Sequence, residues 1–177
     1  MEWRPMKPSD IPFVYQIACH LHPDFYEDIS IFYERLELCP EGCFVLEEVT
    51  IGGYALSHPF TRESPPLNTL LHKLPESTCW YIHDVALLPS FRGNGATSAV
   101  VSKMEELARS HGLQEMTLTS VNNSHTFWNR LGFSVDPSVS CSTYGASLFM
   151  AKRAEYLVLE PEFPYRLVLL QIVQKML

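Results

Sequence analysis

One stretch of the sequence, residues 79–112, constrains the fold more than any other. Its first ten residues are rich in aromatic and branched apolar side chains and predict a buried strand that ends at Pro89. From Ala96 to about His111 the apolar residues recur at helical spacing, and Gly112 follows as a helix stop. A strand that leads through a short loop into an amphipathic helix is typical of α/β proteins.

The loop between this strand and this helix is suited to binding a phosphate group. It reads Arg92-Gly93-Asn94-Gly95-Ala96-Thr97, and its glycines let the main chain come close to a ligand. Unpaired N–H groups and the partial positive charge of a helix start favour an anion there. The loop lacks the Lys-Ser/Thr of a Walker motif and the full three-glycine dinucleotide pattern, so a plain strand-to-helix turn is the alternative interpretation.

Periodicity predicts further strands and helices on both sides of this unit. Strands are expected at residues 1–5, 43–49, 51–57, 116–120 and 142–152, with another beginning at 132–133, and helices at residues 11–18, 28–38 and 124–131. Residues 58–77 contain four prolines and predict a long excursion with one short helix at residues 67–74. This excursion either carries function or only covers a sheet edge.

Composition bounds the function classes. A chain of 177 residues with 46% hydrophobic content fits one globular domain. The 13 Lys and Arg residues face 20 Asp and Glu residues, and this net charge of −7 argues against a general grip on nucleic acid or anionic lipid. No apolar run approaches the roughly 20 residues of a membrane-spanning helix. The N-terminus lacks the basic start and apolar stretch of a secretory signal, so we expect a cytoplasmic protein without nucleic-acid or membrane partners.

The cysteines agree with that expectation. Their number, five, and their irregular spacing indicate free thiols in a reducing compartment better than a disulfide framework. Cys39 and Cys43 form the one close pair, and the nearest histidines are single and scattered. We therefore expect no metal site.

Two motifs in order resemble a known family. The loop 92–97 resembles the R/Q-x-x-G-x-G/A pyrophosphate motif of the GNAT superfamily of acyl-CoA N-acyltransferases, with Thr97 where the family usually has Gly or Ala. Residues 122–133, from Asn122 through the pair Phe127-Trp128 to Leu131-Gly132-Phe133, resemble its second signature. The resemblance covers approximately residues 1–153. It implies a mixed, mostly antiparallel sheet of six or seven strands with splayed central strands, flanked by helices, in the α/β (α+β) class.

The same resemblance implies acetyl-CoA as co-substrate. The pantetheine arm would pair with the backbone of the fourth strand between the splayed strands, much as an added strand would. The residues expected to bind the cofactor are Val85, Ala86, Leu87, Arg92, Gly93, Asn94, Gly95, Ala96, Thr97, Asn122, Phe127 and Trp128. An N-cap role for Asn122 and plain core packing for the two aromatic residues are the alternatives.

Candidate catalytic residues follow from the chemistry of amine acetylation, which needs a base for the amine and an acid for the leaving thiolate. His83 is the first choice for the base, and its position resembles one where family members place a Glu or His base. Strand alternation predicts that His83 and Asp84 lie on opposite faces, so that at most one faces the cleft. Asp84 is a candidate for binding a substrate ammonium or holding the loop.

The acid is less clear, because Trp128 stands where family members often carry Tyr. An indole is no useful proton donor to a thiolate. Tyr144, at the opening of a late strand, is the candidate replacement. The alternative is a buried tyrosine that only satisfies its own hydroxyl.

The acceptor site is expected between residues 20–41 and the excursion 58–77. The first segment is rich in acids and aromatics that could favour a cationic amine, or simply form a solvated helix face: His22, Asp24, Phe25, Tyr26, Glu27, Asp28, Tyr33, Glu34 and Glu37.

The predicted function is acetyl transfer from acetyl-CoA to a primary amine of a small molecule. An acyl-CoA sensor or scaffold with little turnover, and a protein or peptide N-acetyltransferase, stay open. Residues 154–177 are predicted as a C-terminal extension that packs on its own domain or on a partner subunit of a homodimer.

Overall fold

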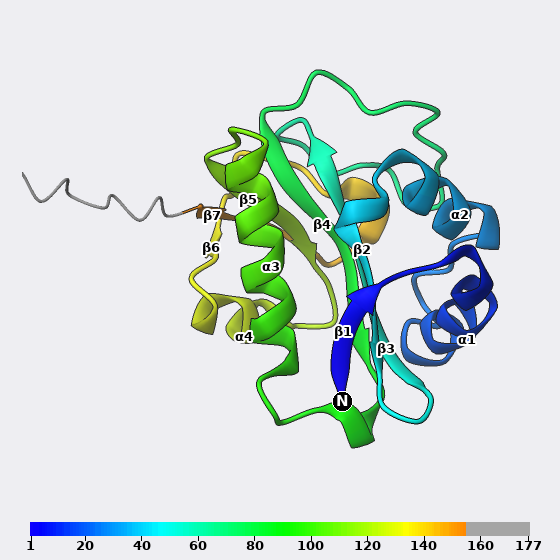
Figure 1. Cartoon of the computed structure of the whole chain (residues 1–177). Helices are drawn as coiled ribbons and strands as arrows, with labels where there is room; N and C mark the ends of the chain where they lie inside the picture. The colour runs from blue at the N-terminus through cyan, green and yellow to red at the C-terminus, as the bar shows by residue number, and fades with distance from the viewer. Residues whose placement is uncertain (155–177) are drawn as a thin grey trace, which may run out of the picture.

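The computed structural model describes residues 1–154, which form a sheet of seven strands with helices on both faces (Figure 1). The order across the sheet is β1-β2-β3-β4-β5-β7-β6. The strands are β1 (Glu2–Pro5), β2 (Cys43–Glu47), β3 (Ile51–Phe60), β4 (Cys79–Leu87), β5 (Glu115–Ser120), β6 (Ser134–Val135) and β7 (Leu148–Arg153). Only β4 and β5 pair in parallel among these strands. The predicted mixed, mostly antiparallel sheet is therefore confirmed.

The helices bury two separate apolar layers against the sheet. Helices α1 (Ile11–Leu21) and α2 (Ile29–Leu38) cover one face, and α3 (Ala96–Ser110) and α4 (His125–Arg130) cover the other (Figure 1). The α3 layer includes Val100 and Met104, both fully buried, because these positions recur at helical spacing toward the sheet. The two layers hold β4 between them.

The central strands separate along their length, as the resemblance implied. β4 pairs with β5 only where Trp80–Ile82 lie opposite Met116–Leu118. β4 then continues to Leu87 beside β3, while β5 continues to Ser120 beside β7. The facing edges of β4 and β5 are thus left without a strand partner beyond Ile82.

The pairing of β3 with β4 contains a bulge. Leu56 lies opposite Asp84, whereas the next residue, Ser57, lies opposite Ile82, so His83 is an extra residue on β4. The bulge changes which face of the sheet the side chains of β4 point to. Trp80 and Ile82 pack in the α3 layer, and after the bulge Leu87 packs there too while Ala86 packs in the layer of α1 and α2. One inserted residue therefore changes the alternation of the strand.

The predicted short helix at residues 67–74 is wrong. Asn68 and His72 have positive φ angles of 54° and 60°, which an α-helix cannot contain. The backbone N–H groups of Leu71 and His72 donate to the carboxylate of Glu34, at 2.8 and 2.7 Å, instead of to helical carbonyls. The side chain of Glu34 on α2 thus accepts hydrogen bonds that helical carbonyls would have accepted.

Two other boundaries differ from expectation. β3 extends to Phe60, so the first residues of the predicted excursion belong to the sheet. The predicted strand at residues 142–152 starts only at Leu148, and Tyr144 lies in a 3-10 turn (Ser142–Tyr144) before it. The predicted C-terminal extension lies outside the described residues, apart from Ala154.

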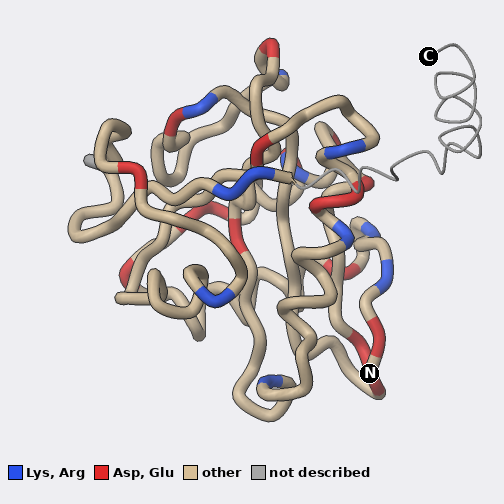
Figure 2. The backbone as a smooth tube through the Cα atoms, turned by 90° about the vertical axis from the view of Figure 1, so that its left-hand side faces the viewer, with Lys and Arg blue, Asp and Glu red and all other residues tan. Residues whose placement is uncertain are grey.

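Charged residues are spread over this framework. In the view of Figure 2, positions of Lys and Arg are scattered among positions of Asp and Glu, and the basic ones do not gather in a stripe. Within residues 1–154, no helix has the length and apolar character needed to cross a membrane.

Candidate functional site

A cavity of about 610 Å³ opens between the separated strands and joins the predicted phosphate loop to the bulge of β4. All fifteen predicted site residues line it except Asn94, which lies in the loop without lining the cavity. A volume of this size is typical of small-molecule and cofactor sites. The structure thus brings together residues from β4, α3, α4 and the turn at Tyr144.

The loop at the start of α3 has the geometry of an anion site. Gly93 and Gly95 adopt positive φ angles of 87° and 72°, and no atom lies within 4 Å of where a Cβ would stand at either position. No side chain caps α3, so its first N–H groups are left for a ligand. Arg92 Nε donates to the carbonyl oxygen of Leu87 at 2.8 Å, which holds the loop against the end of β4.

The free edge of β4 and the second signature form the walls of the cavity. Val85, Ala86 and Leu87 line it along the edge that β5 has left. Trp128 is buried, packs edge-on against Phe133 with ring centroids 5.6 Å apart, and also lines the cavity, so core packing and cavity wall are both its roles. Asn122 lines the cavity, and the N-cap position of α4 belongs to Ser124 instead. The residues present therefore fit a phosphate-bearing thioester cofactor.

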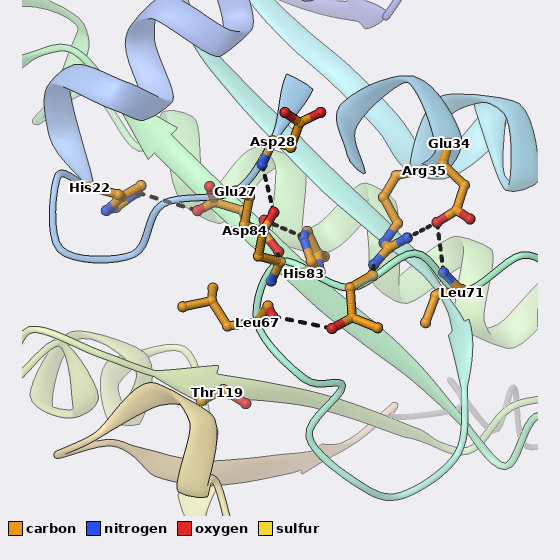
Figure 3. Close-up of polar contacts among 12 residues, drawn as sticks. His22, Glu27, Asp28, Glu34, Arg35, Leu67, Leu71, His83, Asp84 and Thr119 are labelled. Carbon is orange, nitrogen blue, oxygen red and sulfur yellow. Dashed lines mark hydrogen bonds and ion pairs between the residues drawn. The ribbon is translucent and has the colours of Figure 1, made fainter. Parts of the chain in front are cut away.

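The prediction that His83 and Asp84 lie on opposite faces is wrong. Both line the same cavity, because the bulge on β4 inserts His83 and interrupts the strand alternation between them. Each of the two side chains has its own partner from the segment after α1 (Figure 3). The site therefore contains two acid–histidine pairs side by side.

The first pair joins His83 to Glu27. His83 Nε2 and Glu27 Oε2 are 2.9 Å apart, and only 2% of the His83 side chain and 9% of the Glu27 side chain are exposed. Burial alone would raise the pKa of Glu27, but the charge and hydrogen bond of His83 outweigh it and lower that pKa. Glu27 is therefore an ionised carboxylate at neutral pH.

The second pair joins Asp84 to His22, with the ring nitrogen Nε2 3.3 Å from the carboxylate. The negative charge of Asp84 raises the pKa of His22 against the opposing effect of burial. Burial would raise the pKa of Asp84, but His22 and a hydrogen bond from the Tyr54 hydroxyl lower it. The shifts of both pKa values thus favour the charged form of each partner at the cavity wall.

The other residues of the predicted acidic segment have different places in the structure. Phe25 lines the cavity beside His22 and Glu27, with its ring centroid 6.4 Å from that of Tyr144. Asp28 instead caps α2 by accepting from Ser30 N at 2.9 Å, and Glu34 pairs with the buried Arg35. The remaining members Asp24, Tyr26, Tyr33 and Glu37 are exposed.

The sequence did not predict the carboxylate partners of His83 and His22. Glu27 and His83 are 56 positions apart, and His22 and Asp84 are 62 apart, so no local spacing signals either pair. Tyr81 also lines the cavity, whereas the sequence predicts it only as part of a buried strand. The composition of the segment before α2 pointed to the acceptor side, but not to these contacts.

The cysteines of the described chain are unpaired. The five cysteines are free thiols, and burial raises the pKa of Cys39 to about 12. Within residues 1–154, no three or more His, Cys, Asp or Glu side chains are grouped as a metal site would need.

Known structures share this fold. Ard1 from Thermoplasma volcanium matches with a TM-score of 0.67 at 18% identity, over 88% of this chain and 98% of that one. N-acetylglutamate synthase from Neisseria gonorrhoeae, complexed with coenzyme A and N-acetyl-glutamate, matches with a TM-score of 0.69 at 16% identity, over 88% and 35%. Naa20 from Chaetomium thermophilum, with a bisubstrate analogue, matches with a TM-score of 0.63 at 22% identity, over 86% of each chain.

The sequence itself matches a family model. The comparison with curated proteins gives no match. Residues 10–133, from the start of α1 to the end of the second signature, match the model of the acetyltransferase (GNAT) family. This match spans more than half of the chain. It includes both motifs, the separated strands β4 and β5, and the two acid–histidine pairs. The chain therefore belongs to the GNAT acetyltransferase family.

Proposed function

We propose that the protein transfers an acetyl group from acetyl-CoA to a primary amine of a small molecule. The observation that carries the proposal is the single cavity that runs from the uncapped start of α3 to the buried pair of His83 and Glu27. Backbone N–H groups at one end would bind the phosphates, and His83 at the other end would act as the base for the amine. This continuity of the cavity supports binding and proton removal at one site.

The proposed cofactor contacts divide by chemistry. The loop from Arg92 to Thr97 would hold the pyrophosphate through its main chain, and the unpaired edge of β4 at residues 85–87 would hydrogen-bond the pantetheine amides. Asn122, Phe127 and Trp128 would form the opposite wall. Structures of this fold bound to coenzyme A or isobutyryl-CoA support a CoA-type co-substrate, and the acetyl group is our choice among acyl groups.

The proposed reaction is a direct attack of the neutral amine on the thioester carbonyl. The C–N bond forms, the C–S bond breaks, and the sulfur leaves as a thiolate. His83 accepts the proton that the amine nitrogen loses, and Tyr144 donates a proton to the thiolate and regains one through solvent from His83. Burial raises the pKa of Tyr144, so its hydroxyl is protonated at neutral pH, and the same shift makes it a weaker acid. Asp84 holds His22 at the cavity wall.

A small acceptor is favoured over a peptide by the long loop between β3 and β4. Asn68 Oδ1 accepts from Asp28 N at 2.7 Å, and Leu67 N donates to the hydroxyl of Thr143 at 3.3 Å. The loop therefore contacts the segment before α2, across which a peptide groove would need to open, and also the turn before β7. The five free thiols suit the cytoplasm as the place of action.

The test combines binding with transfer. Calorimetry measures acetyl-CoA binding to the purified protein, and release of free CoA thiol measures transfer to a panel of small primary amines beside a panel of peptides. We expect binding, and turnover with small amines above that with peptides. Binding without transfer to any acceptor would replace the enzyme by an acyl-CoA sensor, and turnover confined to peptides would overturn the acceptor class.

A further inference from the structure

Glu27 connects the proposed base to the long loop between β3 and β4 (Figure 3). Its Oε2 is 2.9 Å from His83 Nε2, and its Oε1 accepts a hydrogen bond of 3.2 Å from the backbone N–H of Asn68. Both carboxylate oxygens thus have a partner, and the side chain is almost wholly buried. Such a carboxylate has one fixed orientation, because turning it would break two hydrogen bonds in a site shielded from water.

This orientation determines the proton arrangement on His83. An ionised carboxylate can only accept hydrogen bonds, so Nε2 of His83 must carry the hydrogen. The other ring nitrogen, Nδ1, is buried and has no hydrogen-bond partner among the described residues. In the neutral imidazole, Nδ1 is then the atom with the free lone pair and the atom able to accept a proton.

The neighbouring side chains leave this assignment intact. The ring of His58 on β3 lies 6.0 Å from that of His83, and burial, together with the charge of His83, lowers the pKa of His58 to about 3, so it stays neutral. His58 Nδ1 is bound to the carbonyl of its neighbour Pro59 at 3.0 Å. Arg35 is occupied by Glu34 and by the carbonyl of Thr69. No other carboxylate in the described structure is hydrogen-bonded to His83.

We propose that Glu27 is the positioning residue of His83: it holds the imidazole in the Nε2–H form, so that Nδ1 receives the proton of the attacking amine. The inference rests on the proposed function, in which His83 is the base. When the C–N bond forms, the amine proton moves to Nδ1, Nε2 keeps its own hydrogen, and Glu27 stays ionised opposite the resulting imidazolium. No proton passes to Glu27.

The loop residue Asn68 completes this arrangement. Its positive φ of 54° turns the backbone N–H toward Glu27, while its side-chain oxygen accepts from the N–H of Asp28, the next residue after Glu27. Asn tolerates this left-handed backbone better than most residues. The loop therefore acts on the base through one carboxylate, although it touches none of the reacting atoms in this assignment.

The substitution Glu27→Gln gives a sharp test. The amide oxygen of Gln can accept from the Asn68 N–H, which leaves its NH₂ group facing His83 Nε2. Nε2 must then act as the acceptor, so the hydrogen moves to Nδ1 and the lone pair is lost from the position of the base. Nitrogen NMR of the labelled imidazole distinguishes the two tautomers in the neutral state, independently of any activity.

We expect the Nε2–H tautomer in the wild-type protein and in Glu27→Asp, and the Nδ1–H tautomer in Glu27→Gln. With an active acceptor, kcat of Glu27→Gln should fall by at least about tenfold with KM for acetyl-CoA unchanged, and Glu27→Asp should recover part of it. Glu37→Gln, the same change at an exposed position of α2, should match the wild type in both measurements.

The outcomes separate the two proposals. An Nδ1–H tautomer in the wild-type protein would overturn the role of Glu27, and this measurement needs no variant to fold. Wild-type kcat in a folded Glu27→Gln protein would overturn it as well. The expected tautomers without acetyl transfer by the wild type to any acceptor would uphold the positioning by Glu27 and reject the proposed function alone.

Discussion

Asp84 on β4 and His22, the C-cap residue of α1, form an ion pair in which Nε2 of His22 lies 3.3 Å from the carboxylate. The pair stands beside His83 and Glu27 because the bulge on β4 turns Asp84 toward α1, where the buried hydroxyl of Tyr54 also reaches it. It ties the helix before the acceptor segment to the strand that carries the base. The contribution of this ion pair to the stability of the fold depends on pH.

The pH dependence follows from the two pKa shifts. The pKa of His22 is raised above 6.5 in the folded protein, so its contribution is complete below pH 6.5 and is lost as the pH rises through the raised value. The pKa of Asp84 is lowered below 3.8, so its contribution is lost only as the pH falls below that value. We expect His22→Gln to cost about 1 kcal/mol of unfolding free energy between pH 4 and 6.5, and less at higher pH.

Urea unfolding at a series of pH values checks this expectation. His20→Gln, at an exposed position of the same helix, is the matched control and should leave the stability unchanged at every pH. A loss of stability in His22→Gln that stays constant from pH 5 to pH 9 would contradict an ion pair at this place.

Gly95→Glu should abolish acetyl-CoA binding. The new carboxylate would stand at the start of α3, where the anion is expected, and would repel it. Gly112→Glu is a matched control, because Gly112 has the same φ of 72° and the same open surroundings at the other end of α3. Both variants should lose about 1–2 kcal/mol of stability through backbone strain. Calorimetry should find acetyl-CoA binding in Gly112→Glu alone, and equal binding in both would remove the loop from the site.

Tyr144→Phe tests the proposed proton donor. The change removes the hydroxyl and keeps the ring beside Phe25, so the protein should fold and bind acetyl-CoA as before. We expect kcat to fall about a hundredfold, within the usual range for a general acid. Tyr33→Phe, at an exposed site on α2, serves as the control. A change in kcat of less than twofold would show that the thiolate leaves without help from this residue.

Glu34→Gln should destabilise the fold and loosen the long loop. The Arg35 side chain is fully buried, and Glu34 is the carboxylate that pairs with it while accepting from the N–H groups of Leu71 and His72. Loss of one partner leaves a buried charge uncompensated, at a cost of about 3 kcal/mol. Urea unfolding measures the loss, with Glu37→Gln as reference. Equal stability of the two variants would contradict this account of the loop.

The amino-acid sequence determined the local parts of the site. The loop from Arg92 to Thr97 was predictable because glycines, a preceding strand and a following helix are all encoded within one continuous segment. The separation of β4 and β5 was expected from the two family motifs together, and the pairing of the strands confirms it. The assignment of individual residues to cofactor and catalysis stays a prediction.

The tertiary structure alone decided which side chains meet at the proposed base. The position of the bulge depends on how β3 pairs with β4, so alternation along β4 wrongly separated His83 from Asp84. The contact of Glu27 with His83 joins positions far apart in the chain, and the packing of α1 and α2 on the sheet creates it. The helix expected at residues 67–74 does not form for the same reason. Backbone N–H groups of this segment donate to the carboxylates of Glu27 and Glu34, which lie close to it only in the folded chain.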